Sequence, residues 1–375
     1  MMKEPKLLAE TPELPAEAAP RRDPRTLVKK LAHFLAALFL FILAIQLMTR
    51  GGQSISPRLE GTFPVDNMVS TLGLGWLSAY LVLSGSPVAV VALTLFATGG
   101  INRAQTFTML TGSRMGAAFI VLLVGFMYAM RAKTPDRRRA SIGMGVLALS
   151  LTAVVYIPGM LIGYGLLKSG MVAGVNWHAS SEISTVIDAL WGPIVTFVGD
   201  LLPAPLLFPL GLATILISFK LLDYVLPSLD GERHAGKRAH WLTKPWPMFA
   251  LGSLAALLTL SVSVALTALV PLASKGYIRR KEAIPYIMGA NITTLADTLV
   301  AAMLLGSSVG VQVVLAGTIG VTVVTLFLLA FLYRPLQRAI MALDEWIVAK
   351  TPRLVIFVGI LFVTPVGLMF SGRLF

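Results

Sequence analysis

Five polar side chains lie close together in an otherwise apolar stretch, YIMGANITTLADTLVAAML, which covers residues 286–304. They supply one amide, three hydroxyls and one carboxylate, at Asn291, Thr293, Thr294, Asp297 and Thr298. Oxygens of this kind suit a small hard cation such as sodium, especially where a broken helix frees backbone carbonyls beside them. A helix N-terminus that faces such a break suits an anion. The stretch therefore predicts an ion-binding site inside a membrane helix.

Arg114 is a second charged residue in an apolar segment, 101–130, where such a side chain is costly and usually functional. When the chain is aligned with itself at an offset of 177 residues, Arg114 pairs with Asn291, and we expect the two to lie opposite each other. Asp297 follows Asn291 by about 9 Å along a helix. Two interpretations give Arg114 a function: it binds an anion, or it pairs with Asp297. In the other interpretation Arg114 extends to a membrane surface and Asp297 caps a helix.

The elements that must position these residues are apolar. The chain of 375 residues is 56% hydrophobic and 13% charged, whereas soluble domains average about 25% charged residues. Its long apolar runs approach or exceed the roughly 20 residues that span a bilayer as a helix, and they do not alternate as barrel strands do. We therefore expect an all-α polytopic membrane protein whose partner is the lipid bilayer. The clearest spans are 31–48, 140–167, 205–226, 311–333 and 354–371.

The net charge of +13 comes with Lys and Arg in short stretches between apolar runs, which is a topology signal rather than a nucleic-acid-binding one. There is no cysteine, and the four histidines lack metal-ligand spacing, so we expect no metal centre. Intramembrane proteolysis would need a serine motif together with a histidine at depth, or a G-x-G-D aspartate. Neither combination occurs, so we expect no enzyme, no catalytic residue and no cofactor beyond a coupling ion.

The chain repeats itself at an offset of 177 residues, which places Ser84 on Ser261, Ser86 on Ser263 and Gly112 on Gly289. Internal repeats can determine an architecture. Each copy contains a broken apolar hairpin, 66–98 or 246–274, followed by a broken helix, 101–130 or 282–308. We expect each hairpin to be re-entrant, and Gly289 to break the second helix.

Charge gives the orientation. Basic residues gather at 131–139, 227–245 and 334–353, so these segments and the N-terminus are expected in the cytoplasm, with 168–182 outside. The two copies are then inverted, which is the architecture of secondary transporters. The predicted organisation is a disordered tail at 1–26, a first repeat at 27–167, an extracytoplasmic connection with a helix of undecided crossing at 168–204, a second inverted repeat at 205–333, and a cytoplasmic loop with a C-terminal helix at 334–375.

The motif MGANITT, preceded by LSVSVALT and by a degenerate copy upstream, resembles the sodium–phosphate cotransporter family, whose repeats carry Q-S-S-S-A-T and G-A-N-I-G-T-T. The resemblance implies sodium-coupled symport of phosphate by alternating access in the bacterial inner membrane. By match to the motifs, the residues it carries over are Ser84, Ser86, Ser261, Ser263, Gly112, Gly116, Gly289, Asn291, Ile292 and Thr294. Combined with the charged residues, the predicted substrate- and ion-binding set is Ser84, Ser86, Arg114, Ser261, Ser263, Asn291, Thr293, Thr294 and Asp297, with sodium at Ser261, Ser263, Asn291 and Thr294.

The chain departs from the family pattern at several site positions. Leu83 and Leu260 replace the motif glutamines, Arg114 stands where the family has Asn, and Thr293 replaces Gly. Three alternatives therefore stay open: the serines are small residues that pack helices closely, the chain moves a different anion, or it is a non-transporting membrane scaffold that kept the fold. A homodimer is also left open.

Overall fold

The computed structural model describes residues 24–59, 65–177, 179–225, 244–274 and 278–374. Over these ranges the chain is helical throughout and contains no β-strand. Of the tail predicted at 1–26, residues 1–23 lie outside the described residues, and residues 24–26 belong to α1 (Pro24–Leu59). The basic segment 227–245 also lies almost wholly outside them.

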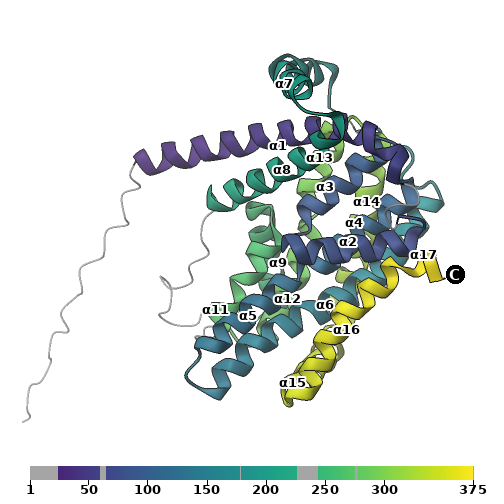
Figure 1. Cartoon of the computed structure of the whole chain (residues 1–375). Coiled ribbons are helices and arrows are strands. Elements are labelled where there is room, and N and C mark those ends of the chain that lie inside the picture. The colour runs from purple at the N-terminus through teal and green to yellow at the C-terminus, as the bar shows by residue number, and fades with distance from the viewer. Residues whose placement is uncertain (1–23, 60–64, 178, 226–243, 275–277, 375) are drawn as a thin grey trace, which may run out of the picture.

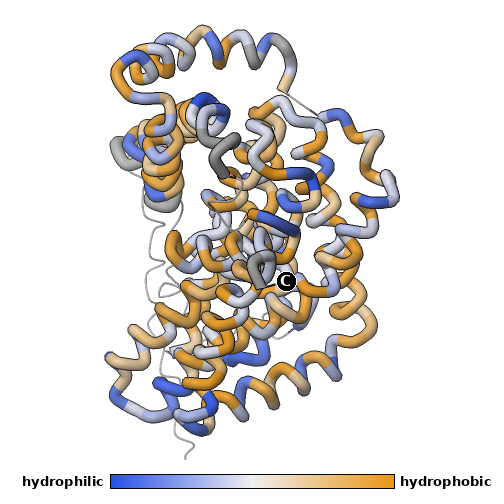
Figure 2. Tube along the Cα trace, turned by 45° about the vertical axis from the view of Figure 1, so that its right-hand side comes forward, coloured by the Kyte–Doolittle hydropathy of each residue, from blue (hydrophilic) through white to orange (hydrophobic). Residues whose placement is uncertain are grey.

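Seven helices in the described residues are long and apolar enough to cross a bilayer, which confirms the all-helical, multi-pass expectation. Their outer surfaces are apolar; Val363, for example, leaves 70% of its surface exposed. Figure 2 shows hydrophobic residues along the outward-facing helices and hydrophilic ones mainly near helix ends. Such a surface fits lipid rather than water. The spans are Val28–Ser54, Arg103–Arg131, Pro135–Lys168, Ala204–Leu221, Arg280–Leu304, Ser308–Phe331 and Thr351–Met369.

Two of these spans consist of two helices each. Arg103–Arg131 contains α4 (Arg103–Ala117) and α5 (Phe119–Arg131), and Arg280–Leu304 contains α12 (Arg280–Thr293) and α13 (Ala296–Leu304). The expected break at Gly289 is wrong, because α12 continues through this residue to Thr293. Gly289 instead lets α12 lie against the carbonyl of Phe249, where a Cβ would overlap it.

Two helical hairpins consist of helices that are too short to cross. They are α2 (Met68–Val82) with α3 (Ser86–Ala97), and α9 (Pro245–Thr259) with α10 (Val262–Thr267) and α11 (Leu269–Ser274). Fifteen residues, the length of α2 and of α9, reach about 22 Å as a helix, less than the roughly 30 Å of a hydrocarbon core. We call residues 83–85 the first tip and residues 260–261 the second tip, because the chain turns between the paired helices there.

Both tips turn through a left-handed leucine. Leu83 has φ 56° and Leu260 has φ 46°, and they are the two non-glycine residues with positive φ in the described part of the chain. Each conformation costs about 1–2 kcal/mol for a residue with a Cβ. The two leucines are 177 residues apart, so the strained turn recurs at the offset that the sequence motifs show.

The same offset relates helix ends and close contacts. Helix α2 corresponds in this way to α9, and the first residue of α4 to that of α12. A Cβ at Gly75 would overlap the carbonyl of Met109, and one at Gly252 would overlap that of Tyr286, so each glycine admits the same close helix approach. Small residues at helix contacts are typical of membrane proteins.

The remaining helices surround these units. α6 (Pro135–Lys168) packs along α14 (Ser308–Phe331), and α1 packs along α8 (Ala204–Val225), which runs antiparallel to it in Figure 1. α7 (Ser181–Leu201), the helix whose crossing the sequence left undecided, is not among the seven spans. α16 (Thr351–Met369) and α17 (Ser371–Leu374) end the described chain.

The segment 334–353 differs from expectation. We expected a connecting loop, whereas α15 (Tyr333–Val348) occupies most of it. Its inner face is held by an ion pair between Asp344, which is buried, and Arg280 at the start of α12. The helix forms because its apolar residues fall on one face, which a charge count between spans does not register.

Candidate functional site

A buried charge cluster joins the two halves of the chain. Arg114, in the last turn of α4, is 2% exposed. One of its terminal nitrogens, Nη1, donates to the hydroxyls of Ser86 at 3.3 Å and Thr294 at 3.1 Å. The other, Nη2, contacts Asp297 Oδ1 at 3.3 Å and donates to the hydroxyl of Thr298. Arg114 therefore links α3 and α4 to the junction of α12 and α13.

Asp297 uses only one of its carboxylate oxygens in this cluster. The residue is 6% exposed. Besides Arg114, Oδ1 accepts hydrogen bonds from the backbone N–H of Thr298 at 2.6 Å and from its hydroxyl at 3.0 Å. Among the described residues, neither Asp297 Oδ2 nor Arg114 Nε has a hydrogen-bond partner. The pair is thus buried and charge-balanced, but its hydrogen bonding is incomplete.

Asn291 bonds to α6. Its amide donates to the hydroxyl of Thr152 at 3.2 Å, and its backbone carbonyl accepts from the hydroxyl of Tyr156 at 2.9 Å, both on α6. No hydrogen bond joins Arg114 and Asn291 in the described part of the chain, so the expected opposition of the two stays a prediction. The guanidinium instead lies one to two turns further on, where Asp297 supplies the opposite charge that a buried Arg requires.

Thr293 also lies apart from the cluster. Its hydroxyl donates to the carbonyl of Ser253 on α9 at 2.9 Å. This position corresponds to Gly116 in the first half, where a Cβ would overlap the carbonyl of Trp76. Thr293 therefore serves the contact between α9 and α12, and its assignment to the ion site, made from its hydroxyl in the polar patch, finds no support in its contacts.

The first tip lies beside the start of α10. The hydroxyl of Ser263 donates to the carbonyl of Leu83 at 3.2 Å, so the start of α10 touches the first tip. The hydroxyl of Ser261 accepts from the N–H of Val264 at 3.3 Å and caps α10. Ser84, Ser261 and Ser263 line one cavity of about 470 Å³. Ser86, two residues beyond Ser84, belongs to the Arg114 cluster instead, so the cavity and the cluster adjoin.

Two further residues line this serine cavity and were not in the predicted set. Lys220 reaches it from α8, and Thr267 reaches it from α10. The side chain of Asp223, three residues further along α8, lies outside the described residues. A lone cation inside the apolar run 205–226 was the signal that could have identified Lys220.

The four residues predicted to hold sodium do not form one site. Ser261 and Ser263 line the serine cavity, Asn291 faces α6, and Thr294 accepts a hydrogen bond from Arg114. A cation at Thr294 would be repelled by the Arg114 guanidinium, and the Thr294 hydroxyl carries no negative charge to offset that repulsion. Within the described residues no cluster of three or more His, Cys, Asp or Glu side chains could hold a metal ion either.

Comparisons of this chain with protein families, with curated proteins and with solved structures give no match. What the site can do must therefore be argued from its own chemistry. That chemistry consists of a cavity with three serine hydroxyls and one lysine, beside a buried Arg–Asp pair.

Proposed function

We propose that this chain is a secondary transporter that moves a small anion by alternating access, with inorganic phosphate as the first candidate substrate and sodium as the coupling ion. One observation carries the proposal: the serines of both tips line a single cavity together with Lys220. Hydroxyl donors and an ammonium group are what an oxyanion requires in its binding site. An apolar core that needed only close helix packing would not require the lysine.

The architecture supports a transporter. Matching tips, helix ends and glycine contacts at one offset favour two structural repeats. The antiparallel packing of α1 on α8, which are counterparts under that offset, is what an inverted relation requires (Figure 1). Helix pairs too short to cross, with their tips meeting inside the protein, favour re-entrant hairpins. Inverted repeats with broken elements around a central site are the usual design of secondary transporters.

Local electrostatics favour an anion over a cation at the serine cavity. Lys220 supplies a positive charge. Helix α3 begins at Ser86 after Gly85, which offers no side-chain cap, so its N-terminal amides add positive potential beside Ser84. Arg114 lies just beyond, although Asp297 neutralises it. The sodium site is not assigned to particular residues, because the four predicted ligands do not converge.

Orientation follows from counting crossings. With the N-terminus in the cytoplasm, seven spans place the junction of α5 and α6 and the amphipathic α15 on the cytoplasmic side. The junction carries five Lys and Arg residues between 131 and 139, and α15 carries Arg334 and Arg338, with Lys350 and Arg353 just after it, as the positive-inside rule requires. We therefore propose a bacterial inner-membrane location with this orientation.

The runner-up is a non-transporting membrane scaffold or a carrier of another anion. One observation favours the scaffold: Arg114 is already bonded to Asp297, Thr294, Thr298 and Ser86, so the cluster is closed in this structure. A transporter must reopen or bypass such a pair during its cycle.

The proposal is tested by uptake of labelled phosphate into proteoliposomes. Uptake is compared between an inward sodium gradient and an equal potassium gradient. Sulfate and a small carboxylate serve as competing anions. We expect sodium-dependent uptake that falls at least about tenfold in Lys220→Met and in Ser84→Ala/Ser261→Ala, because each change removes donors to a charged ligand. Ser169→Ala, an exposed serine at the end of α6, is the matched control and should transport normally.

The result that overturns the proposal is equally specific. Uptake or binding of none of the anions, in sodium or at acid pH, would favour the scaffold. Uptake of another anion without uptake of phosphate would support a transporter and would replace phosphate as its proposed substrate.

A further inference from the structure

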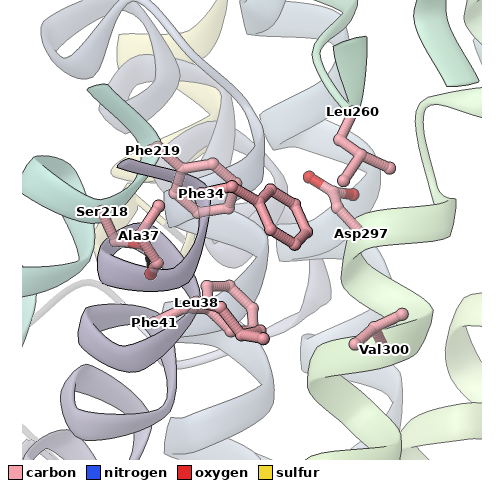
Figure 3. Close-up of a pocket in the computed structure, with 9 residues that line it drawn as sticks. All are labelled: Phe34, Ala37, Leu38, Phe41, Ser218, Phe219, Leu260, Asp297 and Val300. Carbon is pink, nitrogen blue, oxygen red and sulfur yellow. Dashed lines mark hydrogen bonds between the residues drawn. The ribbon is translucent and has the colours of Figure 1, made fainter. Parts of the chain in front are cut away.

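A second cavity lies on the other side of Asp297, between α1, α8 and α13. Its volume is about 110 Å³, and its walls are apolar except at Asp297 and Ser218. Phe34 and Phe41 of α1 and Phe219 of α8 contribute three aromatic side chains. Figure 3 shows the Asp297 carboxylate directed from α13 toward the ring of Phe34. We call this space the Asp297 cavity.

Asp297 lines this cavity, and one oxygen of its carboxylate is unpaired. Arg114 and Thr298 engage Oδ1, whereas Oδ2 has no hydrogen-bond partner among the described residues, and the side chain is 5% exposed. An unsatisfied, buried carboxylate oxygen costs free energy unless a donor reaches it. Ser218, the other polar residue of the wall, already donates to the carbonyl of Ala37, so a ligand that carries a donor would satisfy this oxygen.

From this geometry we infer that the Asp297 cavity binds a small organic cation: an ammonium group attached to a compact apolar body. The ammonium donates to Asp297 Oδ2 and lies near aromatic faces, which attract cations through their quadrupoles. Ser218 donates its hydrogen to the carbonyl of Ala37 at 2.7 Å, so its oxygen can still accept a second ammonium hydrogen. The apolar body then occupies the remaining space among the phenylalanines.

An inorganic cation fits this cavity poorly. Hard cations need several oxygen ligands around them, whereas these walls present the Asp297 carboxylate, the Ser218 hydroxyl and otherwise hydrocarbon. An organic ammonium needs fewer oxygens, because its apolar part gains from burial. The inference does not depend on the proposed anion transport, since the serine cavity shares only Phe219 with this one and has the opposite charge preference.

The entrance lies on the lipid-facing side. Phe34 is 40% exposed and Val300 is 48% exposed, so the cavity is open between α1 and α13. Phe34 follows Lys30 by four residues, or about 6 Å along the helix, which places it near the membrane surface that Lys30 marks. A cationic amphiphile held at that surface can therefore reach the carboxylate.

Binding of benzylammonium to the full chain in lipid nanodiscs tests the inference, with benzyl alcohol as the neutral ligand of equal shape and sodium chloride as the inorganic cation. We expect benzylammonium to bind at least about tenfold tighter than benzyl alcohol, and Asp297→Asn to abolish this preference. Phe34→Leu should weaken benzylammonium several-fold. Phe39→Leu is the matched control, because Phe39 is similarly exposed at 38% but packs on Trp191 instead of lining the cavity.

Three results would overturn the inference. The first is equal binding of benzylammonium and benzyl alcohol. The second is unchanged benzylammonium binding in a folded Asp297→Asn protein. The third is a protein that binds sodium but not benzylammonium and loses its sodium binding in Asp297→Asn. If Asp297→Asn does not fold, the comparison of Phe34→Leu with Phe39→Leu decides: equal effects of the two would also overturn it. Failure of phosphate uptake leaves these outcomes unaffected, so the two proposals fail separately.

Discussion

The Arg114–Asp297 pair should be the most sensitive electrostatic contact in the protein. Its side chains are 1% and 5% exposed, and Nη2 lies 3.3 Å from Oδ1. At an effective dielectric constant of about 20, two unit charges at that separation attract by ~5 kcal/mol. Removing one partner leaves the other charge buried, which costs about 3–5 kcal/mol of folding free energy. We therefore expect Arg114→Met and Asp297→Asn each to destabilise the protein by that amount.

The double variant Arg114→Met/Asp297→Asn should recover much of this loss, because it buries no net charge. Replacing a buried ion pair with neutral groups of similar volume is often close to neutral for stability. Denaturant unfolding in detergent micelles, followed by tryptophan fluorescence, gives the four free energies of the cycle. We expect a coupling energy of about 2–3 kcal/mol.

An exposed pair provides the control. Lys168 and Glu182 are both exposed, so Lys168→Met/Glu182→Gln should be additive within about 0.5 kcal/mol. A double variant at Arg114 and Asp297 that is no more stable than the sum of its single variants would refute the pairing argument. Arg114 would then be held by its hydroxyl contacts alone.

Two further predictions concern stability. Burial raises the pKa of Asp344 from 3.8 to about 7, against the opposing effect of Arg280. The folded state therefore holds this proton more tightly than the unfolded state, so the free energy of unfolding should fall by up to roughly 4 kcal/mol as pH rises from about 4 to 7. Denaturant unfolding across this range measures that slope, and Asp344→Asn should flatten it. An unchanged slope in Asp344→Asn would exclude Asp344 as its source. At the first tip, Leu83→Ile should be at least about 1 kcal/mol less stable than Leu83→Gly. Glycine tolerates the positive φ of this position, whereas a β-branched residue disfavours it more strongly than leucine does. Equal stabilities of the two variants would mean that the turn relaxes.

Much of the architecture could be read from the chain. Apolar runs of sufficient length predicted helices, because a bilayer leaves backbone groups no other partner. The recurrence of Ser84 at Ser261 and Ser86 at Ser263 predicted two related units, and in the structure the two tips meet at one cavity. Arg114 and Asp297 stood out because charges in apolar segments need partners.

Other features depended on which helices pack together. Nothing local distinguishes Leu83 and Leu260 from helical leucines, yet both adopt a left-handed turn. Gly289 looked like a helix break, whereas close packing against Phe249 explains it. Amphipathic α15 was hidden in a segment that a charge count assigned to a loop.

The division between sequence and tertiary structure has a physical reason. Hydrophobicity and helix length act within a segment, so the sequence by itself determined the helices, their repeat and the presence of buried charge. The partner of each polar side chain depends on contacts between segments far apart in the chain. Only the packing of α4, α6 and α13 decided that Asn291 would face Thr152 and that Arg114 would bind one oxygen of Asp297, leaving the other without a partner.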